Sequence, residues 1–154
     1  SPFHNLLRKS NMPRGKRNFK KYSYYHIYNR CNNKEMIIKN SADKQLFINL
    51  LYKFLKEVDL RLIAFCIMDN HYHLIVKTRK NPQNISTYMC KVVTSFSMQI
   101  NRKYQRIGHV FQGRYNAKLL FWKKDLRYAK EYIKQNPVRE GLVRKPEDYP
   151  WSKY

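Results

Sequence analysis

Two histidines stand two positions apart in residues 68–76, a segment rich in β-branched and aromatic residues that favours a β-strand. Because side chains alternate between the faces of a strand, His71 and His73 would project from the same face. Two imidazoles so placed can bind a metal ion, and together with amide or carboxylate oxygens they can hold Mg²⁺ or Mn²⁺. The pair is also consistent with two half-exposed histidines that hydrogen-bond to their neighbours.

A second candidate cluster lies near the C-terminus, where Tyr132 and Asn136 are four residues apart in a segment with helical spacing. Residues four apart share one face of a helix. A tyrosine hydroxyl can attack phosphorus and form a covalent phosphotyrosine, and an amide oxygen can complete a metal site. The alternative is that Asn136 ends the helix ahead of Pro137 while Tyr132 packs on a sheet.

The charge of the chain indicates a polyanionic partner. Its 154 residues include 32 Lys+Arg against 10 Asp+Glu, a formal net charge of +22. This excess exceeds what solubility needs, so nucleic acid is the first expectation, with an anionic membrane surface or a ribosome-like assembly as alternatives. Aromatic residues make up 15% of the chain and are interleaved with basic ones, which suits the stacking and phosphate contacts of single-strand binding. The strand preference of Tyr and Phe accounts for part of this content.

Cysteine spacing and hydropathy indicate the kind of compartment in which the protein resides, reducing and inside the cell. Cys31, Cys66 and Cys90 show no CxxC spacing, which argues for a reducing compartment and against a zinc knuckle or a disulfide framework. No apolar run approaches the length of a membrane span, and no signal-peptide region is present. We therefore expect a soluble intracellular protein with no membrane partner.

The length of the chain predicts one domain at residues 23–154, preceded by a flexible basic arm at residues 1–22. The arm contains basic residues without a single acidic one, and its apolar residues show no sustained period. Its expected nucleic-acid-binding residues are Arg14, Lys16, Arg17, Lys20 and Lys21.

Hydrophobic periodicity and turn residues predict the elements of this domain. We expect strands at residues 24–30, 60–68, 71–77 and 114–121, and helices at residues 42–58 (with Ser41 as N-cap), 84–104 (ended by Gly108) and 124–135 (stopped by Asn136-Pro137). The order βαββαβ with an added helix predicts an α+β fold of the ferredoxin-like, split βαβ kind. It would have one antiparallel sheet with helices on one face and an added C-terminal helix that carries Tyr132.

The sequence resembles a known family. His71-Tyr72-His73 is similar to the His-hydrophobic-His motif of HUH endonucleases. The segments at 108–115 (GHVFQGRY), 132–143 (from Tyr-Ile to Asn-Pro-Val-Arg-Glu-Gly-Leu-Val) and 148–152 (DYPWS) resemble the IS200-like single-tyrosine transposases, above all their REP-associated branch. This resemblance extends from about residue 24 to residue 154.

The resemblance implies a metal-dependent endonuclease and strand transferase that cuts single-stranded DNA beside a hairpin, either a REP-like hairpin or an insertion-sequence end. It assigns the metal-ligand pair to His71 and His73, a third ligand to Asn136 where insertion-sequence members often carry Gln, and the nucleophile to Tyr132. The products would be a 5′-phosphotyrosine and a free 3′-OH, with Mg or Mn as cofactor. Tyr115 is the chief competitor as nucleophile.

Several expectations complete this interpretation. Arg102, Lys103 and Arg114 are further candidates for binding nucleic acid, and a lysine near Tyr132, Lys130 or Lys134, is expected to assist its deprotonation. The resemblance leaves open a monomer or a homodimer and implies a bacterial cytoplasmic protein associated with the nucleoid. The alternative function is a non-catalytic, domesticated DNA- or RNA-binding module, although the RNP1 pattern of RNA-binding sheets is absent.

Overall fold

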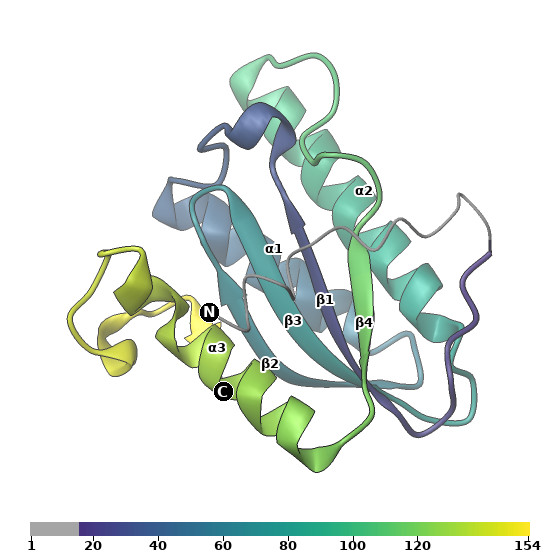
Figure 1. Cartoon of the computed structure of the whole chain (residues 1–154). Coiled ribbons are helices and arrows are strands. Elements are labelled where there is room, and N and C mark those ends of the chain that lie inside the picture. The colour runs from purple at the N-terminus through teal and green to yellow at the C-terminus, as the bar shows by residue number, and fades with distance from the viewer. Residues whose placement is uncertain (1–15) are drawn as a thin grey trace.

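The protein is described by a computed structural model that covers residues 16–154 (Figure 1). These residues form a five-stranded sheet in the order β4-β1-β3-β2-β5, and each pair of neighbouring strands is antiparallel. The elements in chain order are β1 (Tyr24–Arg30), η1 (Asn32–Lys34), α1 (Ser41–Leu55), β2 (Leu60–Ile67), β3 (His71–Thr78), α2 (Asn84–Tyr104), β4 (Asn116–Leu120), α3 (Lys123–Arg139), η2 (Pro146–Asp148) and β5 (Ser152–Lys153). The predicted α+β class and its ferredoxin-like strand order are confirmed.

Helices cover both faces of this sheet. In Figure 1, α3 lies in front of the strands while α1 and α2 lie behind them. The main core lies between the sheet and α1 and α2, where Phe47, Tyr72 and Phe96 are fully buried. A smaller core joins α3 to the opposite face through Ala129 and Ile133. The added helix therefore covers the face that α1 and α2 leave open, and no described helix is long and apolar enough to cross a membrane.

The helix α3 runs through the predicted stop at Asn136-Pro137 and ends at Arg139. Proline removes one hydrogen bond to the carbonyl four residues earlier and crowds that carbonyl, and both effects disturb the helix least near its C-terminal end. The buried Pro137 packs within the structure, and its carbonyl accepts from the amide of Leu142 at 3.0 Å. The interpretation of Asn136 as the end of the helix is therefore wrong.

Other boundaries differ from the prediction by a few residues. The N-cap of α1 is Asn40 rather than Ser41, because the Asn40 side chain accepts from the amide of Ala42 at 2.8 Å. Gln105, with a φ of 51°, ends α2 in a left-handed conformation ahead of Gly108. The helix α1 ends three residues early, β4 is shorter than residues 114–121, and the two-residue strand β5 was not predicted.

The packed part of the chain begins before the boundary predicted at residue 22. Phe19 is 8% exposed and packs edge-on against Tyr25, with their ring centroids 5.1 Å apart. The backbone amide of Lys20 also donates to the Tyr25 hydroxyl at 2.8 Å. The end of the predicted arm is thus part of the domain, while Arg14 lies outside the described residues.

The turn between β2 and β3 is held by an ion pair whose cation is buried. The ammonium of Lys44, a residue of α1 that is 3% exposed, lies 2.7 Å from Asp69 Oδ1 and donates to the carbonyl of Lys39 at 2.9 Å. The backbone of the same turn accepts hydrogen bonds from the amides of Cys31 and Ile38 at 2.7 and 2.8 Å. The start of β3 is therefore fixed to α1 and to the end of β1.

We expect Lys44→Met to lower the free energy of unfolding by about 2 kcal/mol, because it removes the charge-assisted hydrogen bond to the Lys39 carbonyl and leaves the Asp69 carboxylate without its cation. Urea unfolding followed by circular dichroism measures this change. Lys53→Met, on the exposed side of the same helix, is the control and should change stability by less than about 0.5 kcal/mol. Equal stability of the two variants would contradict a structural role for this ion pair.

Candidate functional site

The two predicted histidines share the sheet face that α3 covers. In the register of β1 and β3, Tyr28 lies opposite His73 and Arg30 lies opposite His71. The ring centroids of His71 and His73 are 5.1 Å apart, with the rings nearly perpendicular at 85°. The strand spacing thus brings the two imidazoles together, as their period of two predicts.

The His71 ring is held at both of its nitrogens. Its Nδ1 lies 2.8 Å from Asn70 Oδ1, so Nδ1 donates and the lone pair of the neutral ring resides on Nε2. That Nε2 lies 3.3 Å from the amide nitrogen of Asn136, which is 2% exposed. Asn136 comes from α3 and can turn either its amide nitrogen or its amide oxygen toward this point. Asn70 therefore orients the imidazole toward the helix.

A third histidine, His26 on β1, orients His73. Its Nε2 lies 3.0 Å from His73 Nδ1, and the two rings are stacked with centroids 5.2 Å apart. When His73 Nδ1 donates to His26 Nε2, the lone pair of the His73 ring lies on Nε2, the atom that can then bind a metal ion. The sequence analysis missed His26, although the alternation of His26 with Tyr28 on a predicted strand was the available signal.

Burial keeps all three histidines neutral. Desolvation lowers the pKa of His71 and lowers that of His73 well below its ordinary value. Desolvation also lowers the pKa of His26 to about 3, with a further contribution from Lys118. Neutral imidazole is the form that binds metal ions, so this cluster is in the ligand state at neutral pH.

Tyr132 lies on α3 against this cluster. Its ring packs edge-on to His73, with centroids 5.5 Å apart, and one helical turn separates it from Asn136. Burial raises the pKa of Tyr132, while the Arg139 guanidinium lowers it. That guanidinium lies 4.1 Å from the centre of the Tyr132 ring, and Arg139 also donates to the Tyr132 carbonyl at 2.9 Å.

The cation that contacts Tyr132 is Arg139, whereas the sequence analysis expected Lys130 or Lys134. The ammonium of Lys134 instead lies 5.3 Å above the Tyr154 ring. Arg139 reaches Tyr132 because α3 continues past Pro137, so the error on the helix end also concealed this contact.

Tyr115, the competing nucleophile, lies in a different part of the protein. It packs against the core on the side of α1 and α2. The Arg17 guanidinium lies 4.2 Å from its ring centre and donates to its carbonyl. The structure therefore brings Tyr132, and not Tyr115, to the histidines.

The predicted nucleic-acid-binding residues that the structure describes differ in their surroundings. Arg17 is half-buried against Tyr115, and Lys103 forms an ion pair with the buried Asp43 at 2.7 Å. Both cations are thus engaged within the protein. Exposed basic residues from the prediction are Lys16, Lys20, Lys21, Arg102 and Arg114.

The residues at the site fit a divalent metal ion of moderate hardness. Two neutral imidazoles and an amide converge here, although residues 16–154 contain no group of three His, Cys, Asp or Glu residues that could hold a metal. Imidazole together with oxygen donors suits Mn²⁺ and Mg²⁺ when water and substrate oxygens complete the coordination.

Comparison with known proteins identifies the family of this chain. Residues 19–136 match the family described as IS200-like transposases, a span that includes every residue of the cluster up to Asn136. The chain belongs to the IS200-like transposase family. Arg139 and β5 lie beyond the matched span of this IS200-like transposase.

Two of the similar proteins are described as REP-associated tyrosine transposases. A protein of Haemophilus influenzae described as a REP-associated tyrosine transposase is 30% identical over 101 residues, which cover 60% of this chain and 57% of that protein. The structure of a REP-associated tyrosine transposase bound to a REP hairpin superposes with a TM-score of 0.78 at 19% identity, covering 93% of this chain and 83% of that one. A crystal structure from Deinococcus radiodurans described as a transposase has a TM-score of 0.53 at 15% identity, covering 85% and 98%.

The buried histidines predict a loss of stability in mild acid. The unfolded chain binds protons at histidines near pH 6.5, whereas the lowered pKa values of His26, His71 and His73 prevent this in the folded protein. The free energy of unfolding should therefore be fully present above about pH 6.5 and fall as the pH is lowered toward about 5. Urea unfolding in the presence of a chelator measures this slope.

The matched variants for that measurement are His26→Gln and His109→Gln. His26→Gln should flatten the slope, because it removes one group that titrates only in the unfolded chain. His109 is exposed, so its replacement should leave the slope unchanged. A wild-type stability that is constant between about pH 7 and 5 would contradict the buried neutral cluster.

Proposed function

We propose that this transposase is a metal-dependent single-stranded DNA endonuclease and strand transferase that cuts beside a hairpin. The observation that carries the proposal is the convergence of Tyr132 on His73 and of Asn136 on His71. A nucleophile and a set of neutral metal ligands within one helical turn suit phosphoryl transfer through a covalent intermediate.

In this proposal Nε2 of His71, Nε2 of His73 and the amide oxygen of Asn136 would hold Mg or Mn. Such an ion would supply Lewis acidity to the scissile phosphate. The protein keeps its three ligands uncharged, which leaves the positive charge of the ion available for the phosphate. Asn70 and His26 hold the two imidazoles in the required tautomers.

Tyr132 performs the covalent step. Its hydroxyl gives up its proton to solvent and the oxygen forms a bond to phosphorus, while the bond from phosphorus to the 3′ oxygen breaks and that oxygen takes up a proton from solvent to leave a free 3′-OH. Arg139 favours the tyrosinate and opposes the effect of burial on the Tyr132 pKa. Attack by a 3′-OH on the phosphotyrosine reverses the step and joins strands without a nucleotide cofactor.

The proposed substrate rests on charge and on the relatives. A net charge of +22 suits a polyanion, and the similar structure of a REP-associated transposase holds a REP hairpin. The candidate nucleophile and ligands lie together within one chain, and the proposal allows either a monomer or a homodimer.

Tyr132→Phe should abolish the covalent adduct while DNA binding stays within about twofold, because only the hydroxyl is removed. End-labelled hairpin DNA incubated with Mn²⁺ and resolved on a denaturing gel detects the adduct. Tyr115→Phe is the matched control and should form the adduct normally. If the Tyr132 variant kept the labelled protein band, the proposed nucleophile would be wrong, and if no variant or wild-type protein formed it, the non-catalytic alternative would be favoured.

His71→Ala and His73→Ala should each remove high-affinity Mn²⁺ binding, measured by calorimetry, and should abolish cleavage. His26→Ala removes the group that orients His73, so we expect its Mn²⁺ affinity to fall by about 10- to 100-fold. Asn136→Ala should reduce affinity less than loss of either histidine. Unchanged Mn²⁺ binding by the His71 variant would refute this ligand set, whatever its cleavage activity.

A further inference from the structure

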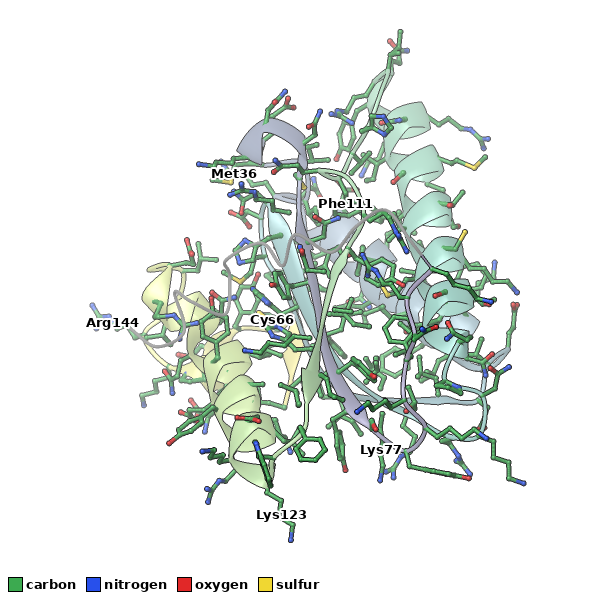
Figure 2. All side chains as sticks on the ribbon, turned by 45° about the vertical axis from the view of Figure 1, so that its right-hand side comes forward. Met36, Cys66, Lys77, Phe111, Lys123 and Arg144 are labelled. Carbon is green, nitrogen blue, oxygen red and sulfur yellow. The ribbon has the colours of Figure 1, made fainter. Side chains whose placement is uncertain are left out.

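The junction of β4 and α3 exposes two large aromatic side chains. Phe121 is 64% exposed and Trp122 is 61% exposed, and their rings meet edge-to-face with centroids 4.7 Å apart. Together with Lys123 and Lys124 they line a surface hollow. These four residues are called the aromatic corner below. Figure 2 shows Lys123 at the outer end of α3, directed away from the sheet.

The packing of α3 on the sheet does not depend on Phe121 or Trp122. The helix α3 is anchored to the sheet by Leu126, Ala129 and Ile133, which lie in the smaller core. The backbone of the corner is fixed separately, because the Trp122 amide donates to the Asp125 carboxylate at 3.1 Å. A rigid backbone thus presents apolar rings to solvent, an arrangement that marks a binding surface.

The charge of the corner identifies the kind of partner. Lys123 and Lys124 are exposed beside the rings, and Arg127 is exposed on the next turn of α3. Exposed aromatic rings flanked by cations are the combination that binds single-stranded nucleic acid, because bases stack on the rings while phosphates pair with the cations. Paired bases of a duplex do not offer their faces for such stacking.

The position of the corner connects it to the proposed nucleophile. Tyr128, which is 56% exposed, lies one helical turn before Tyr132 on the same face of α3. Trp122 lies ten positions before Tyr132, about 15 Å along a helix. An unpaired strand of a few nucleotides could therefore extend along α3 from Tyr132 to the corner.

We propose that the aromatic corner binds unpaired DNA bases in the single strand that flanks the scissile phosphate. This inference rests on the proposed function for the choice of DNA. The corner holds the flanking strand along α3 by stacking, and its lysines neutralise adjacent phosphates. It thereby adds affinity for single-stranded DNA that the hairpin duplex does not supply.

The test compares the full chain with two double variants, Trp122→Ala/Lys123→Ala and Tyr52→Ala/Lys53→Ala. The second is the matched control, because it removes an adjacent aromatic and lysine from α1 on the opposite side of the sheet, where Tyr52 is 39% exposed. Affinities are measured by fluorescence anisotropy for a blunt DNA hairpin and for the same hairpin with a thymidine extension on either end.

We expect the corner variant to lose about tenfold in affinity for an extended hairpin and to bind the blunt hairpin like the wild type. The control variant should bind all of these DNAs normally, and Trp122→Phe should retain most of the affinity. An equal loss on blunt and extended hairpins would overturn the proposal. The proposal would also be overturned if the corner variant bound every DNA normally but lost binding to anionic vesicles, because a membrane surface would then be the partner.

The outcomes of this test are separable from those of the proposed function. If wild-type protein formed no phosphotyrosine but the corner variant still lost affinity for extended hairpins only, the corner would stand as a single-strand binding site without cleavage. If the adduct formed but both double variants bound every DNA alike, the corner proposal would fail while the proposed chemistry stood.

Discussion

The alternation of side chains along β3 is the constraint on which the rest of the site depends. Tyr72, Leu74 and Val76 are fully buried against α1 and α2, so the register of β3 is set by the main core. His71 and His73 must then face α3. A slip of one residue would exchange the two sets and place imidazoles in the core, which the hydrophobic pattern forbids.

The helix α3 turns this strand pattern into a site. Ala129 and Ile133 bury one stripe of the helix, and Asn136 lies on the same side one turn further on. The amide meets His71 because α3 extends to Asn136 in helical conformation. Packing, ligand placement and the contact between Arg139 and Tyr132 therefore all depend on the same uninterrupted helix.

Local periodicity made much of this predictable. The spacing of two on a strand and of four on a helix identified the pairs His71 with His73 and Tyr132 with Asn136, and the strong helical period matched α2 at both ends. Contacts between distant segments were not predictable, because strand register and helix docking are tertiary properties. The contact of His26 with His73 follows from the pairing of β1 with β3. The partners of Arg17 and Lys103, which are Tyr115 and Asp43, are likewise distant in the sequence.

The short strand β5 also protects an edge of the sheet. Ser152 and Lys153 pair with Cys66 and Phe65 of β2, the Ile67 amide donates to the Trp151 carbonyl at 3.0 Å, and the Tyr149 hydroxyl donates to the Ile67 carbonyl. A chain shortened to the family boundary at residue 136 would lose this covering. Its β2 would then carry unpaired backbone groups, a template for intermolecular strand pairing, so the shortened chain would be prone to self-association.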